Sequence, residues 1–512
     1  MIKSFVWVLF LPAVVWAHLQ NDLSKIQPKE IDVSQVQWPV TSASQEPFEI
    51  EGKTSTATLH QISVPTSSKV VIGFLFAPSM FSFEKNQIPH FPVFVDMLLE
   101  GGSGPFSFGQ LVRTSREQGL SFSTHMVGGR LLVRMEVLKE DLEEGLRVLT
   151  SIIMAPKFNA ENFDEWKKRT ANQFSELIEL SSVGNQEEIM WEETQKSLYG
   201  ENSVGSYLFS SRVPKIFDSI IEKDLIATYS KVVIRNNLDV ILVGKSMPGI
   251  KERLAQLVKK IPEQPMSLVS WYPERPIVHK TPKVIVILKP DMTQSNITLL
   301  RVIPKAGEFN RIELATFKIL ENVFSGTFVS ALGVDRVSKE LRVNSGLSYS
   351  PHGALSTSPS HPNTNGFVGS VKLQTPNERL LEGVDAAQKV LDQFLTEGVT
   401  QEEYDASRFS MMARLLTLEP NEGSYFEEYI HSLLNFKPFV RNKIELSVKN
   451  LKERSSAKEA NQYLKDLMTN SSSIILTILG YPSQITVKAL QDKFGADSVK
   501  VMDYRDVVLS YR

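Results

Sequence analysis

The side chains that most often carry metal or nucleophilic chemistry are sparse in this sequence. It has eight histidines and no cysteines among 512 residues, and no two histidines are spaced as His-x-His or His-x-x-x-His. His90 is followed at the third and fourth positions by Val93 and Phe94, which are apolar. Because a catalytic zinc needs several imidazole, thiolate or carboxylate donors around it, we expect this chain to bind no metal and to use no cysteine nucleophile.

A second pair of residues has a different chemistry. Arg342 stands seven residues before Tyr349, which closes the sequence Gly346-Leu347-Ser348-Tyr349. A guanidinium is a rigid cationic fork and a phenol is a hydrogen-bond donor, so the two suit a place where negative charge develops. Their spacing alone also allows a surface ion pair for the arginine and a tyrosine packed under a loop.

Four glutamates lie close together at Glu187, Glu188, Glu192 and Glu193. Their spacing is typical of an exposed acidic helix face, and we interpret them in that way rather than as a ligand cluster.

The elements that must position these residues occur twice in the same order. Two alternating segments predict strands, a helical block follows, then a strand, two helices and a closing apolar strand that ends in glycine. The first copy runs from Thr58 to Gly244 and the second from Val284 to Gly480. The predicted elements are strands at 59–64, 70–75, 131–137, 239–244, 284–289, 297–303, 366–373 and 473–480, and helices at 91–99, 142–154, 160–180, 312–324, 381–395 and 400–416.

The closest local match between the copies sets residues 158–164 beside 399–405. In both segments a polar residue, Asn159 or Thr400, precedes a helical run that begins with acidic residues, as expected of a helix N-cap. The repeat predicts an α+β fold of two homologous lobes. Between them, residues 246–283 hold six prolines, including Pro262 and Pro273, which indicates a surface linker.

The N-terminus predicts export. Met1 to Lys3 is short and basic, Ser4 to Val15 is almost wholly apolar, and Ala17 follows Trp16 where a signal peptidase would cleave. We therefore expect a signal peptide at 1–17, no stable membrane insertion, and a periplasmic or secreted protein. The charge is nearly balanced, with 56 basic and 58 acidic residues, so nucleic acid is not an expected partner.

The duplicated lobe resembles the pitrilysin or insulinase family of zinc peptidases, which have an inverted zinc motif and include the mitochondrial processing peptidase. The resemblance covers roughly Glu46 to Val508, and its most specific part is Phe324-Ser325-Gly326-Thr327-Phe328-Val329-Ser330-Ala331-Leu332 followed by the segment from Lys339 to Ser350. It implies two lobes of the metallohydrolase type found in LuxS and the processing peptidase, each a mostly antiparallel sheet with helices on one face. The expected boundaries are 46–245 for the first lobe, 246–282 for the linker and 283–508 for the second lobe.

The same resemblance shows which zinc ligands this chain lacks. Asp96-Met97-Leu98-Leu99-Glu100-Gly101-Gly102 is similar to the end of the family's metal helix, and alignment on Gly101 puts the motif His-x-x-Glu-His on Pro92, Val95 and Asp96. The third ligand of the family, a glutamate, falls on Asn172 or Gln173. No metal is therefore expected here.

In the family, the residues that match Arg342 and Tyr349 reach from the second lobe toward the zinc, bind the substrate backbone and stabilise the oxyanion. Several members divide the chemistry between two chains. The resemblance thus implies the non-zinc subunit of a two-chain bacterial peptidase, with zinc in a homologous partner and a peptide or unfolded protein as substrate. A catalytically inactive peptide-binding or scaffold protein of the same fold is the alternative. An independent peptidase with a different metal site has no ligand cluster to support it.

Overall fold

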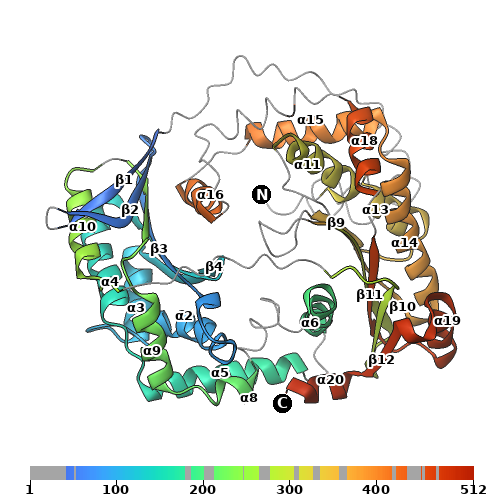
Figure 1. Ribbon diagram of the computed structural model, residues 1–512, viewed down its shortest axis with the longest axis horizontal. Coiled ribbons are helices and arrows are strands. Elements are labelled where there is room, and N and C mark those ends of the chain that lie inside the picture. Colours follow the sequence, from blue (N-terminus) through green and yellow to red (C-terminus); the bar gives the residue numbers. More distant parts are fainter. Residues whose placement is uncertain are drawn as a thin grey trace, which may run out of the picture.

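A computed structural model of the chain contains two six-stranded sheets that face each other (Figure 1). The structure describes residues 42–50, 53–178, 186–200, 213–245, 247–264, 277–304, 311–326, 335–356, 366–417, 422–434, 451, 456–468 and 472–511. The expected signal peptide, 1–17, lies outside these ranges, as do residues 327–334 of the second-lobe motif. Within the described ranges, no helix is both long and apolar enough to cross a membrane.

The two sheets have corresponding strands. The first has the order β1-β2-β6-β3-β5-β4 and the second has the order β12-β7-β11-β8-β10-β9. In each sheet one internal pair is parallel, β2 with β6 and β7 with β11, and the next three pairs are antiparallel. The strands are β1 (Ser42–Ile50), β2 (Lys53–Ser63), β3 (Lys69–Ser79), β4 (Ser121–Val127), β5 (Arg130–Leu138), β6 (Asp239–Gly244), β7 (Lys283–Leu288), β8 (Gln294–Pro304), β9 (His352–Ser356), β10 (Gly366–Pro376), β11 (Ser473–Gly480) and β12 (Val499–Asp503).

One outer strand breaks this correspondence. β1 forms an antiparallel hairpin with β2, whereas β12 comes from the end of the chain and is parallel to β7. The other five strands match in order and direction, so the predicted α+β fold of two homologous lobes is confirmed.

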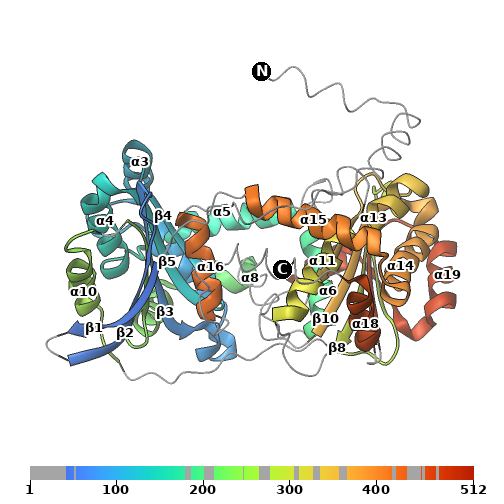
Figure 2. The ribbon, with the colours of Figure 1, turned by 90° about the horizontal axis from the view of Figure 1, so that it is seen from above.

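Most helices cover the outer side of each sheet. Figure 2 shows α4 and α10 outside the first sheet and α14 and α19 outside the second. The main helices are α2 (His90–Glu100), α3 (Phe108–Gln118), α4 (Leu142–Met154), α5 (Ala160–Ile178), α6 (Gln186–Tyr199), α8 (Pro214–Phe217), α9 (Glu222–Val232), α10 (Ile250–Lys260), α11 (Arg311–Ser325), α13 (Arg336–Ser338), α14 (Leu380–Glu397), α15 (Gln401–Thr417), α16 (Glu422–Leu434), α18 (Ala457–Met468), α19 (Gln484–Phe494) and α20 (Tyr504–Tyr511).

The two predicted helix starts have the expected caps. The side-chain oxygen of Asn159 accepts a hydrogen bond from the backbone N–H of Asn162 at 2.8 Å, at the start of α5. At the start of α15, Thr400 Oγ1 accepts from the backbone N–H of Glu403 at 3.2 Å, and Glu403 accepts in return from the backbone N–H of Thr400. This reciprocal pair is a capping box, which satisfies two backbone donors that the helix itself leaves free.

The inner face of each sheet is covered by a helix from the other half of the chain. Alternate residues of a strand point to opposite faces, and the central strands β3, β6, β7 and β11 are buried on both faces along nearly their whole length. In Figure 1, α6 and α16 lie between the two sheets. The two helices occupy the same place in the repeated order of elements, one after α5 and the other after α15. The duplication therefore includes a reciprocal exchange of one helix.

Helix α6 packs on the second sheet. Ile189 and Met190 join a buried cluster with Ile285 and Leu479, and Thr194 Oγ1 lies 2.9 Å from Thr477 Oγ1. This docking corrects the interpretation of the glutamates in the helix as one exposed face. Glu188 is exposed and Glu193 half-buried, but Glu192 is only 2% exposed. The side of the helix that Glu192 occupies packs into the protein, which local spacing could not show.

Helix α16 packs on the first sheet. Tyr425, Phe426, Tyr429 and Ile430 are buried in one cluster with residues of β2, β3, β5 and β6. The Phe426 ring fits against Gly73 of β3, where any Cβ would overlap the ring. This glycine is therefore required by the close approach of the helix to the sheet.

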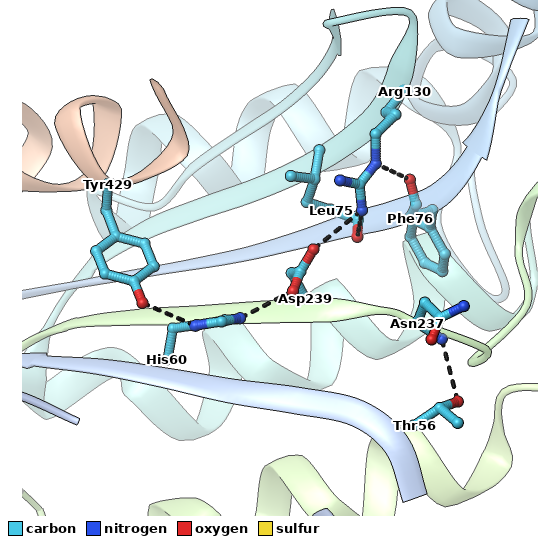
Figure 3. A network of polar contacts seen from close by, with 8 residues as sticks. All are labelled: Thr56, His60, Leu75, Phe76, Arg130, Asn237, Asp239 and Tyr429. Atoms are coloured by element: carbon cyan, nitrogen blue, oxygen red, sulfur yellow. Dashed lines mark hydrogen bonds and ion pairs between the residues drawn. The ribbon is translucent and has the colours of Figure 1, made fainter. Parts of the chain in front are cut away.

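A chain of polar contacts extends from the same helix across the first sheet (Figure 3). The Tyr429 hydroxyl lies 2.8 Å from His60 Nδ1, and His60 Nε2 lies 2.8 Å from Asp239 Oδ1. Arg130 donates to Asp239 Oδ2 at 3.0 Å and to the carbonyl oxygens of Leu75 and Phe76. In the tautomer with hydrogen on Nε2, His60 donates to the carboxylate and accepts from the tyrosine, so both ring nitrogens have a partner.

We predict that Gly73→Ala destabilises the protein by about 1–3 kcal/mol, because the new methyl group would displace Phe426 and with it α16. Urea unfolding followed by circular dichroism would measure the change. Gly109→Ala in α3 is the matched control, since no heavy atom lies closer than 4.0 Å to a Cβ there. It should alter the unfolding free energy by less than about 1 kcal/mol. Equal stability of the two variants would contradict this packing.

We also predict that stability falls between pH 10 and 12 because of Tyr429. Burial, and then the negative charge of Asp239, raises its pKa from 10.0 to about 12. A raised tyrosine pKa stabilises the fold fully below pH 10, and this contribution is lost as the pH rises through 12. The two-unit difference corresponds to about 2.7 kcal/mol.

Tyr429→Phe should remove this part of the alkaline dependence. At pH 8 it should destabilise the protein by about 1–3 kcal/mol, because His60 Nδ1 loses its partner. Urea midpoints at both pH values, compared between wild type and variant, test the assignment. An unchanged pH dependence in the variant would show that other groups cause the alkaline loss.

Candidate functional site

The structure brings Arg342 and Tyr349 together. The Arg342 guanidinium carbon lies 4.6 Å from the centroid of the Tyr349 ring, which is the geometry of a cation–π contact. Tyr349 is 71% exposed and Arg342 is half-buried. The tyrosine is therefore not packed under a loop, and within the described residues no acidic side chain pairs with the arginine.

The backbone between these two residues has an unusual turn. Residues Lys339–Asn344 form a π-helical turn, η6, directly after α13. The backbone N–H groups of Leu347 and Ser348 both donate to the carbonyl oxygen of Leu341, at 3.0 and 3.1 Å. Leu341 and Leu347 are buried and anchor the turn, while Gly346 has a φ of +56°, which favours glycine. Single π-turns within helices are frequent at functional sites.

Buried polar groups fix the start of this turn. Asp335 caps α13 by accepting from the backbone N–H of Ser338 at 2.9 Å. Burial raises the pKa of the Asp335 carboxyl, although its hydrogen bonds with Ser338 oppose the shift. Arg336 donates two hydrogen bonds to the carboxylate of Glu403, at 2.8 and 2.7 Å. Burial raises the pKa of Glu403, but the bonds from Arg336 and Thr400 outweigh burial and lower it overall.

A second arginine holds the other end of the turn. The Arg379 guanidinium donates to the carbonyl oxygens of Ser345 and Gly346, at 3.2 and 3.3 Å, and Glu382 holds it in place. Ser348 Oγ accepts from the backbone N–H of Gln374 at 3.3 Å, which ties the loop to β10. Arg342 and Tyr349 are thus held by a braced loop, although both side chains reach the surface.

The positions on which the resemblance places the zinc motif lie on α2 and do not form a donor set. Pro92 has no side-chain donor atom, and Val95 is packed in the core of the first lobe at 4% exposure. Asp96 is exposed on the same helix. The helix ends at Gly101, where any Cβ would overlap the carbonyl oxygen of Lys157. The fold therefore retains the helix and its terminal glycine, but zinc does not fit the side chains it presents.

The expected positions of the third ligand do not complete a site either. Asn172 and Gln173 are exposed on α5. Asn162 Nδ2 donates to the carbonyl oxygen of Gly101 at 2.7 Å, and Arg169 forms an ion pair with Glu100, so α5 lies against the end of α2. Among the described residues there is no group of three histidines, cysteines, aspartates or glutamates that could hold a metal ion.

Two of the described histidines, His90 and His60, have buried or half-buried rings. His90, the first residue of α2, is half-buried, and burial lowers the pKa of its imidazole. His60 has the partners of a catalytic histidine, but the Tyr429 hydroxyl beside it is buried and remains protonated at neutral pH, because its pKa is raised to about 12. We therefore assign the His60 contacts to the docking of α16.

Sequence reasoning missed one feature near Arg342 and Tyr349. Trp191 of α6 is exposed and lies under the ammonium group of Lys372, a residue of β10. The two residues come from different halves of the chain, so no local motif could indicate their contact. A sequence signal for this contact could come only from a comparison of equivalent positions in the two copies of the repeat.

A family model described as the peptidase M16 inactive domain matches residues 219–411. A Helicobacter pylori protein called non-peptidase homolog YmxG is 23% identical over 397 residues, which covers 75% of this chain and 82% of the relative.

Solved structures share the fold. The M16 inactive-domain protein of Pseudomonas fluorescens superposes with a TM-score of 0.68 at 17% identity, over 86% of this chain and 98% of that one. The periplasmic protease PqqL of Escherichia coli gives a TM-score of 0.67 at 14% identity, over 93% of this chain but 51% of PqqL. The chain thus spans about half the length of that protease.

The family match, the curated relative and the fold agree with the residues at the site. The second lobe places an arginine and a tyrosine in contact, and α2 is part of the described residues that contain no metal-binding group. Residues 219–411 thus match the M16 inactive domain, and the chain as a whole resembles an inactive homologue of the pitrilysin, or M16, peptidases.

Proposed function

We propose that this chain is the non-zinc subunit of an exported peptidase of the pitrilysin type. The second lobe, 283–508, contributes Arg342 and Tyr349 to substrate binding, and a homologous partner chain holds the zinc. The first lobe, 46–245, keeps the fold but no metal ligands.

The observation that carries this proposal is the Arg342–Tyr349 contact. Two polar side chains with no acidic partner among the described residues are held side by side by a loop that Arg379 and Asp335 brace. A surface contact of no consequence would not need such support. A guanidinium and a phenol hydroxyl in fixed positions can donate to a peptide carbonyl and to the negative charge that develops on it.

The exported location is part of the same proposal. It rests on the apolar segment after Lys3, which lies outside the described residues, and it agrees with the description of PqqL as a periplasmic protease. A peptidase outside the cytoplasm would act on peptides or unfolded proteins, which present the extended backbone that this pair of donors suits.

One finding favours a second function. The Helicobacter pylori relative is called a non-peptidase homolog, and this name fits a protein that binds peptides or supports an assembly without cleaving a substrate. The two functions differ in one measurable respect: only the first predicts a reaction rate that depends on Arg342 and Tyr349.

We predict that the purified chain alone cleaves no peptide, and that it gains activity when mixed with the zinc-motif homologue of the same organism. Arg342→Ala and Tyr349→Phe should each lower the rate of the mixture about 10²-fold, because each removes one donor to the developing charge. Cleavage of a quenched fluorescent peptide, together with the zinc content of each chain, would measure this.

Arg113→Ala is the matched control, since Arg113 is an exposed arginine of α3 whose ion pair is with Glu117 of the same helix. It should leave the rate unchanged. If the mixture gains no activity, or if all three variants behave alike, the half-site proposal is wrong and the binding or scaffold function takes its place.

A further inference from the structure

The contact between Trp191 and Lys372 repeats a contact of the first lobe. In the first sheet, the Arg134 guanidinium carbon lies 5.2 Å from the centroid of the Phe426 ring. In the second sheet, the Lys372 ammonium lies 5.3 Å from the centroid of the Trp191 ring. Each pair joins an inner-face residue of one sheet to an aromatic residue of the exchanged helix.

Strand register shows that the two cations are equivalent. Gly244 and Gly480 end the corresponding strands β6 and β11, so residues at equal distances before them are equivalent. The third residue before each glycine can be followed through its paired residues on the next two strands. The resulting rows are Ile241, Gly73 and Arg134 in the first sheet, and Thr477, Thr298 and Lys372 in the second. Lys372 therefore occupies the place of Arg134.

The two lobes use this place differently. In the first lobe the Phe426 ring is fully buried, and Arg134 forms ion pairs with Glu136 and Glu427, at 3.0 and 3.3 Å. In the second lobe Trp191 is 41% exposed, and Lys372 has no ion pair within the described part of the chain. In the first lobe the ring is covered and the cation is paired with carboxylates of the same chain. In the second lobe the cation and an aromatic face stay open.

The strand that carries Lys372 is connected to the loop that carries Tyr349. Lys372 is paired with His352 across β10 and β9, and His352 is three residues after Tyr349. Gln374 is two residues beyond Lys372 on the same strand face. Its backbone N–H donates a hydrogen bond to Ser348 Oγ of the Tyr349 loop. Residues two apart in a strand are about 7 Å apart, so the backbone of Lys372 lies about that far along β10 from the residue that binds the Tyr349 loop.

We propose that Trp191 and Lys372 form a second substrate subsite, which selects polypeptide segments that carry an acidic side chain beside an apolar one. The carboxylate pairs with the Lys372 ammonium, and the apolar side chain packs on the open face of Trp191. This inference rests on the proposed function, because it names the class of peptide that reaches Arg342 and Tyr349.

The test measures binding rather than cleavage. The probes are a short fluorescein-labelled peptide in which glutamate and phenylalanine alternate with threonine, and the same peptide with lysine in place of glutamate. Fluorescence anisotropy should show that the wild-type chain prefers the acidic peptide by about tenfold at low salt, and that the preference shrinks as salt screens the charges.

The variants Lys372→Glu and Trp191→Ala divide the subsite into its two parts. Lys372→Glu should reverse the preference toward the lysine peptide, and Trp191→Ala should weaken both peptides about equally. Lys500→Glu is the matched control, since Lys500 is an exposed lysine of the outer strand β12, and it should change neither affinity. Circular dichroism would confirm that each variant is folded.

Failure of the subsite differs from failure of the proposed function. If the wild type binds both peptides alike, or neither, or if Lys372→Glu and Lys500→Glu have the same effect, the subsite is wrong. The half-site would still stand on the loss of cleavage in Arg342→Ala. A reversed preference without any cleavage in the mixture would support the subsite in a protein that binds peptides and does not hydrolyse them.

Discussion

The architecture depends on covering both faces of two sheets whose central strands are apolar on each face. In the first sheet, Val70 and Ile72 are buried on one face and Val71 on the other. Each face therefore needs its own layer of helices. Outer helices cover one face, and the exchanged helices α6 and α16 cover the other. Because each lobe supplies the cover of its neighbour, neither sheet is complete within its own half of the chain, and the hydrophobic effect holds the two halves in a fixed relation.

Most elements could be predicted because their signals are local. The repeated strands and helices follow from apolar periodicity, and the caps at Asn159 and Thr400 follow from a few neighbouring residues. The exchange could not be predicted in this way, since a helix has the same amphipathic pattern whichever sheet receives it. Glu192 illustrates the limit: its spacing suited an exposed face, but the position of α6 on the second sheet buries it.

The candidate site shows the same division. The motif around Tyr349 drew attention to Arg342, which the structure places against its ring, while the match of Pro92 and Val95 to zinc-motif positions stays a prediction of the resemblance. The π-helical turn and the brace from Arg379 depend on backbone geometry that no residue type specifies. Trp191 and Lys372 are brought together only by the exchange of α6, so they become visible only in three dimensions.

The two lobes differ in the contacts that the exchanged helices α16 and α6 make with their sheets. Where α16 enters the first sheet, the aromatic ring is buried, the cation is neutralised by two carboxylates, and His60 ties the helix through Tyr429 to Asp239. These contacts are all internal to the protein. Where α6 packs on the second sheet, Ile285 occupies the place of His60 and a pair of threonines joins the helix to β11. The lysine and tryptophan keep their open sides. The polar groups that stay open therefore lie on the second sheet, in the lobe that carries Arg342 and Tyr349.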